Sequence, residues 1–176
     1  YMCDNNEPAE TKPKSFLGKK HNLSPIKESK IIIPQTPIPN PFNLNTSLPI
    51  FKYTNEILTA IDTNQVIVIA GKTGCGKTTQ VPQLIYRNAE AQNKKVKILI
   101  TQPRRIAAVS IAKRLSSELK GKVGDLVGYH VGMNPYYNSE KSQIIIKTTG
   151  IFLEELVHEK NNMNNYTHLI LDEVHE

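Results

Sequence analysis

The chain has 176 residues and a net charge of +6, from 22 Lys and Arg against 16 Asp and Glu. Its length fits one well-buried domain, its positive balance fits a polyanionic partner, and its two cysteines, Cys3 and Cys75, exclude a disulfide framework and indicate a reducing compartment. No run approaches the ~20 apolar residues of a membrane span, and the N-terminus lacks a secretory layout. We therefore expect a cytoplasmic protein, or alternatively a nuclear one, without membrane contact.

Residues 1–47 differ in composition from the rest of the chain. Prolines divide a stretch rich in Asn, Lys and Ser, and Ile31-Ile32-Ile33 is its one apolar cluster. Such a segment buries too little apolar surface to offset the entropy of ordering its chain. We predict a disordered tail over residues 1–47, in which the isoleucines either dock onto the folded part or belong to a plain linker.

From Leu48 onward, apolar runs alternate with helical patterns, which predicts an α/β fold with a parallel sheet and helices on both faces. The predicted strands are Val66–Ala70, Val96–Thr101, Leu126–Val131, Gln143–Thr148 and His168–Leu171. Helical spacing predicts helices over Thr78–Ala91, from Ile106 to Leu119 with Gly121 as a stop, and over Ile151–His158. Residues 161–165 are predicted to form a loop.

A phosphate-binding loop is the most informative motif of the chain. Residues 71–78 read GKTGCGKT and fit the pattern G-x-x-x-x-G-K-[ST] at every specified position, directly behind the predicted strand Val66–Ala70. Lys77 is expected to reach the β- and γ-phosphates of a nucleoside triphosphate, and the Thr78 hydroxyl to ligate Mg²⁺. The predicted nucleotide-binding residues of this loop are Gly71, Thr73, Gly74, Cys75, Gly76, Lys77, Thr78 and Thr79.

An acidic pair ends the last predicted strand. Asp172 and Glu173 follow the apolar residues Leu169-Ile170-Leu171, at the edge where a parallel sheet presents its ligands. Asp172 is expected to hold Mg²⁺ together with Thr78, and Glu173 to deprotonate the water that attacks the γ-phosphate. Because a GTPase needs no glutamate at this place, the pair favours ATP hydrolysis, with Lys77, Asp172 and Glu173 as catalytic residues. A charged helix start is the alternative for these residues taken alone.

Four blocks of sequence, in order, resemble the DEAH/RHA group of superfamily 2 RNA helicases, over Leu48 to Glu176. They are the loop extended as GKTGCGKTTQVPQ, TQPRRIAA from Thr101, Thr148-Thr149-Gly150, and Asp172-Glu173-Val174-His175-Glu176. The resemblance implies a RecA-like P-loop NTPase lobe over residues 48–176 that uses ATP and Mg²⁺ and binds RNA. It also implies that Arg114 stacks on the adenine and that His175 couples the ATP site to a second lobe.

Arg104, Arg105, Thr148 and Thr149 are the candidate RNA contacts. Pro103 fixes the turn before a helix, which leaves the two arginines near the positive end of that helix, where a strand phosphate can bind. The threonine hydroxyls add neutral donors, so both motifs would follow the sugar-phosphate backbone without reading sequence. Two solvated arginines and a threonine turn are the alternative.

In the resembling helicases, the second RecA-like lobe and the arginine fingers follow the position of Glu176. We therefore expect a partial sequence, C-terminally incomplete, that is poorly stable and slow in turnover when alone. The resemblance also places a further strand between the phosphate-loop strand and the strand that precedes Asp172. That strand is expected to be missing here.

Within the family, three segments look similar to the Tudor-domain-bearing spindle-E type, although other RHA-type members share these sequences. They are Gly128-Tyr129-His130-Val131-Gly132, Thr148-Thr149-Gly150 and Asp172-Glu173-Val174-His175. That type works in piRNA-guided transposon silencing, which would imply piRNA-pathway proteins as partners. Two other functions stay open: an RNA clamp or scaffold that binds ATP without unwinding, and a DNA-directed translocase of the same superfamily. The retained Lys77, Asp172 and Glu173 disfavour a degenerate site.

Overall fold

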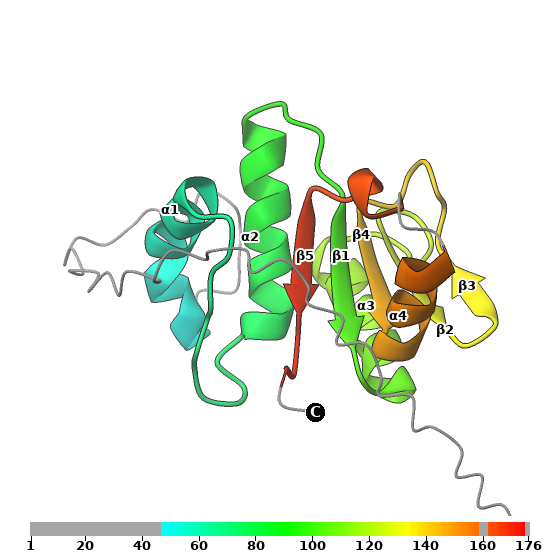
Figure 1. Ribbon diagram of the computed structural model, residues 1–176. Coiled ribbons are helices and arrows are strands. Elements are labelled where there is room, and N and C mark those ends of the chain that lie inside the picture. Colours follow the sequence, from blue (N-terminus) through cyan, green and yellow to red (C-terminus); the bar gives the residue numbers. More distant parts are fainter. Residues whose placement is uncertain (1–46, 159–161, 175–176) are drawn as a thin grey trace, which may run out of the picture. The chain divides into compact units, whose positions relative to one another are not determined.

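The computed structural model describes residues 47–158 and 162–174, so the predicted tail lies, apart from Ser47, outside the described residues. The described part contains a five-stranded sheet in the order β3-β2-β4-β1-β5 (Figure 1). Neighbouring strands are parallel, except that β3 pairs antiparallel with β2. The predicted α/β class is confirmed. The strands are β1 (Ile98–Gln102), β2 (Val127–Val131), β3 (Asn134–Tyr136), β4 (Ile144–Thr148) and β5 (His168–Leu171).

Helices cover both faces of the sheet (Figure 1). On one face α3 packs against the strands and α2 packs against α3, while α4 lies on the opposite face. Alternate residues of β1 and β4 therefore enter different layers: Ile100 and Ile146 join the core cluster with α2 and α3, and Leu99 and Ile145 face the α4 side. The helices are α1 (Thr54–Thr63), α2 (Lys77–Ala91), α3 (Arg105–Glu118) and α4 (Thr149–His158), with 3₁₀ turns at Pro49–Tyr53 and Asn162–Asn165.

The predicted strand Val66–Ala70 is wrong. Among the described residues this segment pairs with no strand, and it connects α1 to the phosphate loop without forming a helix or a strand (Figure 1). Val66 and Val68 are 81% and 91% exposed, whereas Ile69 packs against the core. An apolar run becomes a strand only where a neighbour supplies backbone donors and acceptors. A further strand is expected between this segment and β5, and none of the described residues forms one.

Smaller differences have local causes. Strand β3 was not predicted, because it is short, polar and contains Pro135, which only an edge strand tolerates. Its signal is the two-residue turn that starts with Gly132, at φ 58°. Helix α4 begins at Thr149 rather than Ile151, and the predicted loop contains the turn Asn162–Asn165. Helix α3 ends near the predicted stop, but Lys120, at φ 57°, adopts the left-handed conformation in place of Gly121.

Candidate active site

Two glycines of the phosphate loop are required by its backbone. Gly74 and Gly76 have φ angles of 78° and 106°, a region in which a side chain is strained. At Gly76 space is also lacking, since an added Cβ would lie 2.9 Å from Ile50 Cγ2 and 3.1 Å from Leu48 Cδ1. The turn before α1 thus packs directly under the loop, and Ile50 N also donates to Cys75 O at 3.2 Å.

Lys77, the first residue of α2, lies over the loop. Its Nζ donates to Gly71 O at 2.6 Å and to Lys72 O at 3.1 Å. The backbone N–H groups of the first helical turn have no partners within their helix, so this terminus suits an anion. The ammonium and the helix terminus together form a cradle with the chemistry that a triphosphate needs.

Thr78 and Asp172 meet across the sheet edge although they are 94 positions apart. Thr78 Oγ1 donates to Asp172 Oδ2 at 2.6 Å, and Asp172 N donates to Thr101 O at 3.3 Å. A hydroxyl and a carboxylate at this distance are oxygen ligands of the kind Mg²⁺ prefers. The residues present therefore fit the expected ion, and Thr78 and Asp172 would be its protein ligands.

Gln102 belongs to this cluster, and sequence reasoning missed its role. The residue ends β1, is 3% exposed, and donates from Nε2 to Asp172 Oδ2. Its position at the carboxyl end of a parallel strand was the available signal. Gln102 from β1 and Thr78 from α2 donate to the same carboxylate oxygen, so that Asp172 is held from two elements.

The remaining predicted loop residues differ in exposure. Thr73 is exposed, and Cys75 is half-buried with Sγ 3.8 Å from Lys77 Nζ. Thr79 is buried, and its hydroxyl accepts from Gln80 Nε2 at 3.2 Å. The Thr79 side chain therefore points into the protein, which leaves its backbone amide as the group suited to a phosphate.

Glu173 follows Asp172 in an unusual backbone conformation. Its φ is 53°, in the left-handed region, and its side chain is exposed. Backbone of this kind costs free energy and clusters at functional sites. Glu173 thus directly follows the residue that Thr78 contacts, while His175 lies outside the described residues.

The candidate RNA residues follow the carboxyl ends of two adjacent strands. Arg104 precedes α3 and Arg105 begins it, directly after β1. Thr148 ends β4 in register with Gln102, and Thr149 begins α4. Both arginines are exposed, Thr149 is half-buried, and Thr148 is buried. The structure brings the two motifs to one sheet edge but covers the side chain of Thr148.

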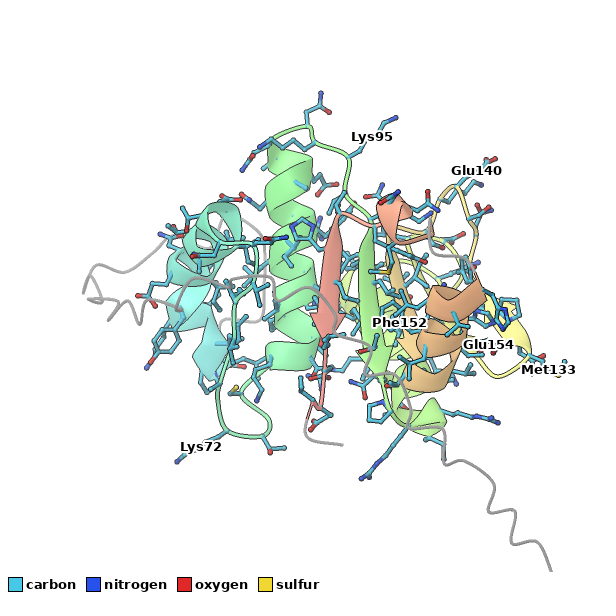
Figure 2. All side chains as sticks on the ribbon, in the orientation of Figure 1. Lys72, Lys95, Met133, Glu140, Phe152 and Glu154 are labelled. Atoms are coloured by element: carbon cyan, nitrogen blue, oxygen red, sulfur yellow. The ribbon has the colours of Figure 1, made fainter. Side chains whose placement is uncertain are left out.

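The β2–β3 hairpin extends this surface. An added Cβ at Gly132 would lie 3.7 Å from Arg105 Cζ, so the guanidinium rests against the hairpin turn. Met133 at the tip is 96% exposed (Figure 2).

Arg114, the predicted adenine contact, lies on α3 and is exposed. Its Nε donates to Glu118 Oε1 at 2.9 Å. Glu118 also accepts from α2, through Gln80 and Gln83. The predicted base contact and the phosphate-loop helix are thus joined through one carboxylate.

A second cluster of titratable groups lies on the α4 side of the sheet. Lys147 of β4 is 1% exposed, and its Nζ donates to both carboxylate oxygens of Glu155 at 2.6 Å. His130 Nδ1 lies 3.6 Å from Glu155 Oε1. Burial alone would lower the pKa of Lys147, but hydrogen bonds to Glu155 and Tyr166 raise it. The pKa of His130 is lowered, first by burial and second by the charge of Lys147. The charge of Glu155 acts in the opposite direction but does not offset them.

The described residues contain neither a cluster of metal-ligating side chains nor a membrane-spanning helix. Over residues 47–158 and 162–174, no three or more His, Cys, Asp and Glu side chains gather as a metal site would require. In the same ranges, every helix is too short or too polar to cross a bilayer.

Residues 51–176 match the family model described as DEAD/DEAH box helicase. The chain is 47% identical over 134 residues to the "Probable ATP-dependent RNA helicase spindle-E" of Drosophila mojavensis, and 48% over 132 residues to that of Aedes aegypti. These alignments cover 76% and 75% of this chain but 9% and 10% of the relatives, so the chain spans about a tenth of their length. The similarity to the spindle-E type is thereby confirmed. Since the family model matches well over half of its residues, the chain belongs to the DEAD/DEAH box helicase family.

Proposed function

We propose that the chain is the ATP-binding lobe of an ATP-dependent RNA helicase, which couples ATP hydrolysis to translocation on RNA and to its unwinding. The observation that carries the proposal is the 2.6 Å hydrogen bond from Thr78 Oγ1 to Asp172 Oδ2, because it joins the phosphate loop to the acidic pair. The relatives bear the name ATP-dependent RNA helicase, which supports the choice of nucleotide and of nucleic acid.

Each residue of the cluster has a role in the hydrolysis. Lys77 turns from its loop carbonyls to the β- and γ-phosphates, and Thr78 and Asp172 hold Mg²⁺. When bound there, the ion would neutralise negative charge on the phosphate oxygens. Glu173 accepts a proton from the attacking water as the water oxygen bonds to the γ-phosphorus and the bond from that phosphorus to the bridging oxygen breaks, which releases ADP and phosphate. Gln102 keeps the Asp172 carboxylate in place.

The nucleic-acid path follows from the same sheet edge. Arg104 and Arg105 bind strand phosphates, Thr149 adds donors at the start of α4, and Arg114 stacks on the adenine base. His175 and a second RecA-like lobe complete the motor in a longer protein. Its place is the cytoplasm, and the spindle-E relatives make piRNA-pathway proteins its candidate partners.

The test uses the full-length protein and a 3′-tailed duplex, offered both as RNA and as DNA. Glu173→Gln is expected to lower kcat for ATP hydrolysis by about 10²- to 10⁴-fold while ATP binding persists, whereas Lys77→Ala weakens binding as well. A Glu173→Gln protein with wild-type kcat would remove that residue from the proton transfer. Unwinding of DNA alone would favour the translocase, and ATP-dependent RNA binding without unwinding of either duplex would favour the clamp.

A further inference from the structure

Glu118, the last residue of α3, gathers three donors from two helices. Its Oε1 accepts from Arg114 Nε at 2.9 Å. Its Oε2 accepts from Gln80 Nε2 at 2.9 Å and from Gln83 Nε2 at 2.5 Å. An ordinary surface pair along one helix would involve Arg114 alone. The two amides from α2 make the carboxylate part of the interface between the helices.

The two glutamines cannot replace this partner with water. Gln80 and Gln83 are 2% and 4% exposed, and buried amide donors are costly when unpaired. Burial by itself would raise the pKa of Glu118, but the hydrogen bonds from Arg114, Gln83 and Gln80 lower it below its ordinary value. The carboxylate is therefore charged at neutral pH and binds donors on both of its oxygens.

Gln80 connects this cluster to the phosphate loop by direct contact. Its backbone N–H donates to Gly76 O at 2.8 Å, and its Cγ lies 3.2 Å from the place of an added Gly76 Cβ. Contacts thus run without a gap from Gly76 through Gln80 and Glu118 to Arg114. Since Glu118 holds the guanidinium at its Nε edge, the planar face of the exposed Arg114 stays open to a stacking partner.

We propose that Glu118 is a positioning residue of the nucleotide site, which holds Arg114 at a fixed distance from the phosphate loop so that both ends of one nucleotide are bound at once. The inference rests on the proposed function, because it takes the ligand to be ATP. It assigns no contact with the nucleotide to Glu118 itself. Its effect on binding passes through Arg114.

This role predicts different effects on the binding of two ligands that both occupy the phosphate loop. ATP has a base for Arg114 to contact, whereas inorganic triphosphate with Mg²⁺ has only the phosphates. Loss of Glu118 frees the guanidinium and weakens ATP binding, but it leaves triphosphate binding nearly intact. A general loosening of α2 would weaken both ligands together.

The experiment measures KM for ATP, kcat, and Ki for magnesium triphosphate in the full-length protein. Glu118→Ala is expected to raise KM by about tenfold, as for a lost hydrogen bond to a charged group, with Ki within about twofold of wild type. Glu118→Gln keeps an acceptor oxygen and should show a smaller rise. The double variant Arg114→Ala with Glu118→Ala should have the same KM for ATP as Arg114→Ala alone, because Glu118 acts through Arg114.

Glu90→Ala is the matched control. Glu90 also lies on a helix of this interface and accepts from an arginine, Arg87, at 3.1 Å, but on the exposed side of α2. Glu90→Ala should change neither KM for ATP nor Ki for magnesium triphosphate. Equal rises of KM and Ki in Glu118→Ala, or an unchanged KM, would overturn the positioning role while leaving the proposed function intact. A wild-type protein that neither binds nor hydrolyses ATP would overturn both.

Discussion

Strand β4 and the segment Val66–Ala70 are similar in sequence and different in structure. One reads IIIKT and the other VIVIA, and both are short apolar runs followed by a functional motif. β4 lies between β2 and β1, and all of its residues are buried. Val66–Ala70 pairs with no strand among the described residues, and its alternate valines are exposed. Apolar composition therefore makes a strand possible, and ladder partners on a neighbouring strand decide whether it forms.

A buried charged residue also shows that neighbours decide whether a side chain fits its position. Lys147 is a charged residue in a strand whose residues are all buried, and it is tolerated because Glu155 on α4 binds its ammonium with both oxygens. The Tyr137 and Tyr166 rings lie 5.7 and 5.5 Å from the same nitrogen. The neighbourhood of a residue outweighs its type in both regions.

Hydrogen exchange should show the largest contrast between the two regions. Amides of β1 and β4 open only with global or near-global unfolding, so in the isolated chain they should exchange about 10³-fold or more slowly than those of Val66–Ala70. Mass spectrometry of peptides covering each segment measures this ratio. Equal protection would show that Val66–Ala70 has ladder partners after all.

The full-length protein sharpens the same measurement. We propose that there a further strand pairs between β5 and Val66–Ala70, since the Drosophila mojavensis relative extends well beyond the 9% of its length that aligns with this chain. Protection of Val66–Ala70 should then rise towards that of β4. Fast exchange in both proteins would contradict the added strand and leave the segment as a loop.

Breaking the ion pair in β4 should have the next largest effect. Glu155→Ala leaves a buried ammonium without its counter-ion, and the expected loss of unfolding free energy is about 3–5 kcal/mol. Glu154→Ala, at an exposed neighbour on α4 (Figure 2), is the control and should change stability by less than about 0.5 kcal/mol. Urea denaturation measures both variants. A loss below about 1 kcal/mol for Glu155→Ala would show that water reaches Lys147.

One substitution made at two valines compares the regions directly. Val127 of β2 is 1% exposed and Val68 is 91% exposed. Val127→Ala removes buried methyl groups and leaves a cavity, which should cost about 2 kcal/mol, whereas Val68→Ala should cost less than about 0.5 kcal/mol. Thermal or urea unfolding of both variants tests the difference. A comparable loss at Val68 would mean that its side chain is covered in solution.

Much of the fold and of the candidate site could be read from the sequence, and the larger failures have one cause. Strands β1, β4 and β5 and helix α2 follow from apolar runs and helical spacing, and the meeting of Thr78 with Asp172 follows from the combination of a phosphate loop with an acidic pair at the carboxyl end of a parallel strand. Gln102 and Glu118 were missed because their partners are distant in sequence. Val66–Ala70 was misjudged for the same reason, since a single run carries no information about its neighbours.

The smallest predicted effect concerns how the unfolding free energy depends on pH through the titratable cluster on the α4 side of the sheet. His130 pairs in register with Lys147 and faces Glu155 and Glu154 from α4 and the ring of Tyr137. Burial and Lys147 lower its pKa, so below about pH 6.5, the ordinary value for histidine, the unfolded chain binds the proton first. Its contribution to stability is complete above that pH and is lost as the pH falls through the lowered pKa.

His130→Gln should therefore flatten the fall in unfolding free energy between about pH 6.5 and 5, a range above the titration of ordinary carboxylates. His168, whose pKa burial also lowers, contributes a separate share, so His168→Gln should flatten the curve independently and the two changes should add. Urea denaturation across that range measures both slopes. A slope unchanged by His130→Gln would mean that the imidazole stays solvated or takes its proton without disturbing Lys147, and the cluster on the α4 side of the sheet would then be less closed than its distances indicate.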